Sequence, residues 1–139
     1  MFSARIYWLV SAMSGLSSVA LGAFGAHGLK QLVFPEMLTV YQTGVQYHFI
    51  HTLVLLVISG VLLIPSLNLS VIKTLKWAAN LMIVGILLFS GSLYTMTFLS
   101  ISGEFPNWLG PITPLGGLTF IIAWGLLAIA AFQLPIEDK

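Results

Sequence analysis

The sequence predicts an all-α protein, a bundle of four transmembrane helices with an interfacial segment between the first helix and the second. Of its 139 residues, 58% are hydrophobic and only 6% are charged, and the mean hydropathy is +1.03. The apolar residues gather in four long stretches, and almost every charged residue lies outside them. A soluble domain of this size could not keep so much apolar surface from water, whereas a bilayer accommodates it.

Each predicted span approaches the length of about 20 residues that crosses a hydrocarbon core about 30 Å thick. The approximate bounds are residues 6–26, 45–64, 75–99 and 112–132. Helices are the expected form, because backbone groups in lipid must pair within their own segment. We interpret residues 1–139 as a single integral membrane domain. Its first span is expected to be a retained helix, because its apolar run is longer than a typical signal-peptide core.

The segment before the second span is expected to lie at the membrane surface. Residues 29–33 alternate apolar and polar side chains, as on a short interfacial helix. Pro35 and Glu36 then indicate a new helix start, with proline at the first position and an acid in the first turn. A helix over residues 35–64 would be about 45 Å long. We therefore expect it to bend near residues 43–44 or to project out of the bilayer.

The distribution of lysine and arginine predicts the orientation of the chain. With four spans, the two termini and the middle loop share one side of the membrane, which then holds Arg5, Lys73, Lys76 and Lys139. The opposite side holds Lys30 alone. The positive-inside rule therefore predicts a multi-pass protein of the bacterial inner (plasma) membrane with both termini in the cytoplasm.

Small residues are expected to bring the helices together, because burial from water cannot drive association within lipid. The first span carries such a stripe at a spacing of four, consisting of Ser14, Ser18, Gly22 and Ala26. The fourth span offers Gly117 and Gly125 on one face. Packing within the chain is the favoured interpretation of these stripes, and homodimerisation is the alternative.

Polar side chains are expected to converge in one pocket of the outer leaflet. The candidates are His27, His48, His51, Ser90 and Tyr94. A spacing of three residues places His48 and His51 on one face of a helix. Intramembrane ionisable groups are candidates for functional sites, although hydrogen bonds between helices are the favoured role for these histidines.

Two further roles stay open for the histidines. The first is a cofactor site, in which His27, His48 and His51, with Glu36 as a fourth ligand, would bind zinc or copper. The second is a path for protons or small solutes. Other chemistries are disfavoured: cysteine is absent, the carboxylates lie outside the spans, and a Ser–His–Asp triad would lack its acid. A net charge of +1 without a basic run argues against a nucleic-acid partner.

Four motifs in order along the chain resemble one family. They are LGAFGAHGL at 21–29, YQTGVQYHFIH at 41–51, FSGSLY at 89–94 and TPLGG at 113–117. Together they are similar to the YgdD/YwdK family of small bacterial inner-membrane proteins, a domain-of-unknown-function family with mitochondrial relatives. The resemblance implies a four-helix membrane protein without an established reaction. It places seven residues in the family signature, namely His27, Tyr47, His48, His51, Ser90, Ser92 and Tyr94.

The leading functional hypothesis is a non-enzymatic membrane protein that serves as an accessory or assembly partner in a larger membrane complex. The alternative is a binding or redox module that holds a metal, haem or quinone at the histidines. A third class is a small-solute channel or transporter. The expected surroundings are the lipid bilayer and either a membrane-protein complex or a homo-oligomer.

Overall fold

The computed structural model describes residues 3–104 and 107–134, and within these ranges it is helical and without strands. Four α-helical segments are long and apolar enough to cross a membrane. In chain order the elements are α1 (Ala4–His27), η1 (Leu29–Gln31), α2 (Pro35–Val61), α3 (Leu69–Gly85), η2 (Ile86–Ser90), α4 (Gly91–Ile101), η3 (Asn107–Leu109) and α5 (Ile112–Phe132). The predicted four-helix transmembrane bundle is therefore confirmed, with α5 spanning residues 112–132 as expected.

Helix α2 begins where the sequence indicated, with Pro35 at its first position, Glu36 in its first turn and an extended Phe34 before it. It remains α-helical through residues 43–44 and ends at Val61. The helix therefore includes the ten residues that precede the predicted span at 45–64. The interfacial segment before it contains a single 3-10 turn, Leu29–Gln31.

The third span is one helical rod with an irregular centre. Asn68 caps its start, because its side-chain oxygen accepts a hydrogen bond from the backbone N–H of Val71 at 2.9 Å. The α-helical hydrogen bonding of α3 gives way to a π-helical turn, η2, over Ile86–Ser90 before α4 continues the rod. No feature of the sequence had predicted this turn.

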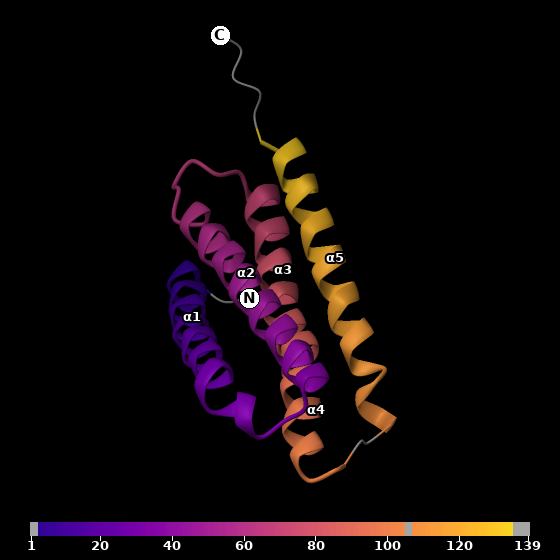
Figure 1. Ribbon diagram of the computed structural model, residues 1–139. Coiled ribbons are helices and arrows are strands. Elements are labelled where there is room, and N and C mark those ends of the chain that lie inside the picture. Colours follow the sequence, from indigo (N-terminus) through magenta and orange to yellow (C-terminus); the bar gives the residue numbers. More distant parts are fainter. Residues whose placement is uncertain (1–2, 105–106, 135–139) are drawn as a thin grey trace.

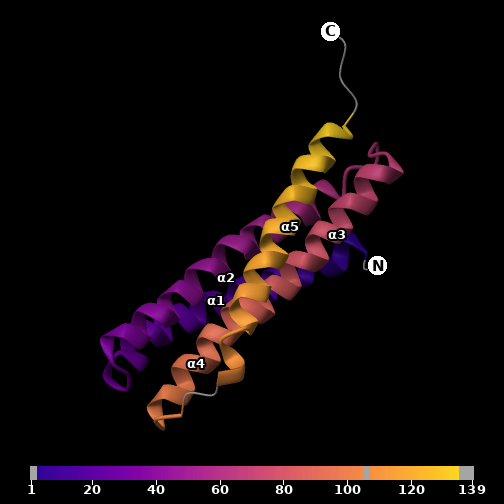
Figure 2. The same ribbon diagram turned by 90° about the vertical axis from the view of Figure 1, so that its right-hand side faces the viewer.

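The four spans alternate in direction, and the rod formed by α3, η2 and α4 lies beside α2 at the centre of the molecule (Figure 1). Helix α1 packs chiefly along α2, and α5 packs along α3 and η2 (Figures 1 and 2). Tyr7 links α1 to α3 near one end, since its buried hydroxyl donates to the side-chain oxygen of Asn80 at 2.9 Å. This end carries Arg5, Lys73 and Lys76, while Lys139 lies outside the described residues.

Glycines set the closest approaches between helices. A Cβ atom added to Gly116 of α5 would lie 2.7 Å from the Cα atom of Phe89 in η2. Gly22 of the predicted α1 stripe faces Val45 of α2, with 3.3 Å to the nearest side-chain atom from an added Cβ. Ser18 and Gly22 of the stripe thus pack within the chain, whereas Ala26 is exposed. On α5 the expectation is confirmed in part: an added Cβ at Gly117 would lie 3.8 Å from the ring of Phe89, whereas one at Gly125 would meet nothing within 4 Å, and the closest approach is made by Gly116.

Candidate functional site

The two central histidines lie midway along α2, not in its first turns. The helix starts at Pro35, so His48 and His51 follow 13 and 16 residues later, about 20–24 Å along the axis. Both side chains are buried. The histidines therefore lie near the middle of α2 and not in its first turns, while their depth in the bilayer stays a prediction.

His48 belongs to a chain of hydrogen-bonding groups that crosses three helices. Its Nε2 atom lies 3.0 Å from the Ser14 hydroxyl of α1, and its Nδ1 atom lies 3.2 Å from the Tyr94 hydroxyl of α4. The Ser14 hydroxyl also lies 2.6 Å from the hydroxyl of Thr52, one turn further along α2. Hydroxyl groups can both donate and accept. The chain from Thr52 to Tyr94 is therefore compatible with either neutral tautomer of His48.

His51 is held in one tautomer. Its Nδ1 atom lies 2.7 Å from the carbonyl oxygen of Tyr47, which can only accept, so Nδ1 carries the hydrogen. Its Nε2 atom faces the indole N–H of Trp124 on α5 at 3.4 Å, and an indole can only donate. The ring also stacks on Phe120 with centroids 3.6 Å apart. His51 therefore ties α2 to α5 as a neutral side chain.

The two histidines diverge because three residues of an α-helix turn through about 300°, which leaves their side chains about 60° apart. Since α1 and α5 contact different sides of α2, this angle sends His48 toward α1 and α4 and His51 toward α5. The single pocket expected from the sequence is thus two separate arrangements.

The remaining candidates do not join either arrangement. Ser90 is fully buried in η2, and its hydroxyl has no hydrogen-bond partner among the described residues. His27 and Glu36 are exposed at the ends of α1 and α2. Within residues 3–104 and 107–134, no three histidine, aspartate or glutamate side chains are grouped closely enough to hold a metal ion. The four predicted metal ligands are therefore not brought together.

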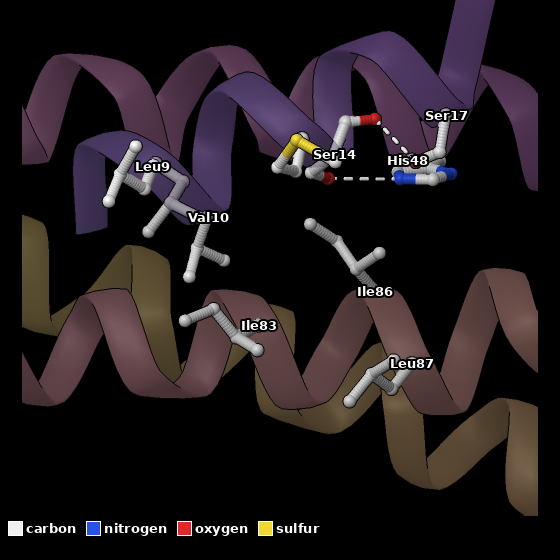
Figure 3. A pocket seen from close by; sticks show the side chains of 10 residues that line it. Leu9, Val10, Ser14, Ser17, His48, Ile83, Ile86 and Leu87 are labelled. Atoms are coloured by element: carbon white, nitrogen blue, oxygen red, sulfur yellow. Dashed lines mark hydrogen bonds between the residues drawn. The ribbon is translucent and has the colours of Figure 1, made fainter. Parts of the chain in front are cut away.

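A cavity of about 440 Å³ lies beside the His48 chain. Its walls come from α1, α2, α3 and η2, and they are mainly apolar. Ser14, Ser17 and His48 form its polar part, and Figure 3 shows Ser14 and His48 across the space from Ile86 and Leu87. This arrangement can accept an apolar molecule and offer it hydrogen-bonding groups at one place.

Sequence reasoning missed several residues of these arrangements. The spacing of Ser14 predicts a role in helix packing, although its hydroxyl contacts His48. Trp124 and Phe120 looked like ordinary apolar residues of a span, yet both hold the ring of His51. A usable signal existed for Asn80, because an amide within an apolar span requires a partner, which Tyr7 supplies.

Comparisons with known proteins place the chain among membrane proteins. Residues 21–117 match the family described as "Protein of unknown function (DUF423)". The UPF0382 membrane protein YwdK of Bacillus subtilis is 43% identical over 129 residues, covering 93% of this chain and 98% of the relative. A UPF0382 membrane protein of Haemophilus influenzae is 38% identical over 91% of this chain and 94% of its own.

The similarity extends to a eukaryote. The UPF0382 membrane protein C1782.12c of Schizosaccharomyces pombe is 36% identical over 88% of this chain and 98% of its own length. No solved structure matches the chain. The YwdK resemblance drawn from four sequence motifs is thereby confirmed.

Proposed function

The chain belongs to the DUF423 family of membrane proteins, and from that premise we propose that it is a non-enzymatic accessory or assembly partner in a larger complex of the bacterial inner membrane. The observation that carries the proposal is that most of the described residues lie in the membrane-spanning helices. Between the spans the described helices leave only short connections, at residues 62–68 and at 28–34 around a single 3-10 turn. A protein built in this way meets its partners chiefly within the bilayer.

Gly125 marks one surface suited to such a partner. It lies near the middle of α5, is exposed, and has no atom within 4 Å of an added Cβ. Glycine in a membrane span permits the close approach of a neighbouring helix, and no helix of the described chain uses this position. The surface therefore fits a helix from another protein.

Affinity purification tests this role. The tagged chain is extracted in a mild detergent, and its co-purifying proteins are quantified for wild type, Gly125→Leu and Gly60→Leu. Gly60 is the matched control, because an added Cβ there also meets nothing within 4 Å. A stoichiometric partner lost in Gly125→Leu and kept in Gly60→Leu is the expected result. Recovery of only free monomer or homodimer would contradict the proposal.

The polar side chains of the spans support a non-enzymatic role. His51 is bonded to Tyr47 and Trp124, and Tyr7 to Asn80. Among the described residues, the carboxylates Glu36 and Glu104 lie at helix ends or in a connection, where they cannot complete a Ser–His–Asp triad with these histidines.

We propose that both termini face the cytoplasm, because Arg5, Lys73 and Lys76 lie at one end of the bundle and Lys30 at the other. The chain has no cysteine, so single introduced cysteines report sidedness cleanly. A membrane-impermeant maleimide applied to intact cells is expected to label Lys30→Cys and to spare Ser66→Cys. The reverse pattern would invert the topology.

A further inference from the structure

We propose that the cavity between α1, α2 and η2 binds a neutral lipid without a headgroup that carries a carbonyl oxygen on a ring, the chemical class of the isoprenoid quinones. The proposal goes beyond the accessory role, because a bound small molecule neither requires nor excludes a protein partner. Four features of the described residues support it: the size and opening of the cavity, its hydrogen count, its depth and the π-helical turn in its wall.

The size and opening of the cavity suit a ligand that arrives from the membrane. A volume of about 440 Å³ lies within the usual range for small-molecule sites. Three of its lining side chains, Leu9, Met13 and Leu87, are 57%, 64% and 68% exposed. Exposed apolar side chains of a span face lipid, so the mouth of the cavity opens sideways into the bilayer.

The polar part of the cavity has one more hydrogen than the contacts within it use. Thr52, Ser14, His48 and Tyr94 bring four hydrogens, one on each hydroxyl and one on the neutral imidazole. The contacts that join them number three, and each uses one hydrogen. One hydrogen is left over. When Tyr94 and Thr52 donate inward along the chain, it lies on Ser14, which lines the cavity.

Ser17 cannot supply a hydrogen in the same way. Its hydroxyl donates to the backbone carbonyl of Ser14 at 2.8 Å. The cavity therefore presents one free donor, which suits a ligand with a hydrogen-bond acceptor such as a carbonyl oxygen.

Depth excludes ordinary phospholipids as the preferred ligand. Ser14 lies 10 residues from the start of α1, about 15 Å along the axis, which is half of a hydrocarbon core about 30 Å thick. The ester carbonyls of a phospholipid lie at the edge of that core beside a charged headgroup. Bringing one to Ser14 would drag the headgroup into the hydrocarbon at high cost. A neutral ring carbonyl reaches this depth freely.

The wall opposite Ser14 and His48 is irregular. Ile86 and Leu87, which line the cavity, belong to the π-helical turn. Such turns occur often at functional sites, because the extra residue shifts side chains out of α-helical register. Here the shift lies at the level of the polar groups, as Figure 3 shows for Ile86 and Leu87 opposite Ser14 and His48.

A binding experiment with a defined probe tests the proposal. The protein is placed in phosphatidylcholine nanodiscs and titrated with decylubiquinone, a benzoquinone with a ten-carbon tail, beside empty nanodiscs. Saturable binding near one molecule per chain is expected for wild type. Ile83→Phe fills the cavity and is expected to abolish binding, whereas Val84→Phe, which is 40% exposed and outside the lining, is the matched control.

The serines test the hydrogen bond. Ser14→Ala is expected to weaken binding about threefold to tenfold, the value of one hydrogen bond. Ser18→Ala is the matched control on the same helix, because Ser18 lies outside the lining and its hydroxyl donates to the carbonyl of Gly15, and it should leave binding unchanged. Thermal unfolding of each variant checks that it is folded. If Ser14→Ala does not fold, the loss of binding in Ile83→Phe tests the proposal alone. Binding no greater than in empty nanodiscs would overturn the proposal. So would equal binding by folded Ser14→Ala and wild type, or a co-purified phospholipid that the quinone does not displace.

Discussion

The replacement Gly116→Ala tests the closest contact between helices in this fold. An alanine Cβ at this position would lie 2.7 Å from the Cα atom of Phe89 and 2.8 Å from its Cβ atom. Ordinary van der Waals contact begins near 3.4 Å, so the new methyl group is too close to this Cα atom by about 0.7 Å, and it lies nearer still to the backbone nitrogen of Phe89. The Cα atom belongs to the backbone of η2 and cannot rotate away, so α5 and η2 would have to separate.

The expected cost follows from two opposing effects. Overpacking of a rigid contact destabilises by about 1–3 kcal/mol, and the separation also loosens the contact of Phe120 with Gly85 one turn further on. Alanine in place of glycine returns at most about 1 kcal/mol through its higher helix propensity. We therefore expect Gly116→Ala to lower the free energy of unfolding by about 2 kcal/mol. Gly125→Ala, in open space on the same helix, should be neutral or stabilising.

Reversible unfolding in mixed micelles measures this difference. Sodium dodecyl sulfate is titrated into protein in a mild detergent, and the loss of tertiary structure is followed by tryptophan fluorescence. Both variants replace a glycine of α5 by alanine, so the effect of helix propensity cancels between them. The difference in their free energies of unfolding then reports the contact of Gly116 with η2. If Gly116→Ala and Gly125→Ala unfold at the same mole fraction of dodecyl sulfate, α5 does not approach η2 as described.

Three further substitutions have expected outcomes in the same assay, and added Zn²⁺ has one in thermal unfolding. Ser90→Ala removes a buried hydroxyl without a partner among the described residues and should be neutral or stabilise by about 1 kcal/mol. Ser92→Ala breaks a hydrogen bond of 2.7 Å to a threonine of α5 and should destabilise by about 0.5–1.5 kcal/mol. If Ser90→Ala destabilises the protein more than Ser92→Ala does, the hydrogen bonding described for the two serines is wrong. Tyr7→Phe loses the bond to Asn80 and should cost about 0.6–1.5 kcal/mol, and an unchanged transition would count against that link. Equimolar Zn²⁺ should leave the melting temperature within about 1 °C, because the described histidines do not converge; stabilisation that His48→Ala abolishes would contradict this.

The membrane spans could be predicted because their signal is local. A run of about 20 apolar residues suffices to identify a span, and the proline at position 35 fixed the start of α2. The π-helical turn at Ile86–Ser90 had no such signal. Its register depends on how α5 and α2 pack against the third span, and no local pattern of residues encodes that packing. The choice of Gly116 over Gly125 as the contact glycine depends on rotation of α5, which is a tertiary property as well.

The candidate site was predicted in composition but not in arrangement. His48 and Tyr94 were expected to meet, and their ring nitrogen and hydroxyl lie 3.2 Å apart. The expected meeting with His51 failed because the two side chains leave α2 about 60° apart. The meeting with His27 failed because the apolar limits placed the start of the second helix at residue 45, too close to the histidines. Polar residues that precede the apolar run belong to α2 in the structure. His48 is therefore midway along α2, away from His27 at the end of α1.

The different surroundings of the two central histidines separate a structural role from a responsive one. His51 has partners that can each act in one way only, a carbonyl that accepts and an indole that donates, so its protonation pattern is fixed by the fold. His48 has a hydroxyl on either side, so the hydrogens of its chain can reverse without breaking a contact. A ligand that accepts a hydrogen bond in the adjoining cavity can therefore select one arrangement at little cost. For this reason, removal of the His51 ring should chiefly weaken the attachment of α5, and removal of the His48 ring should chiefly alter what the cavity binds.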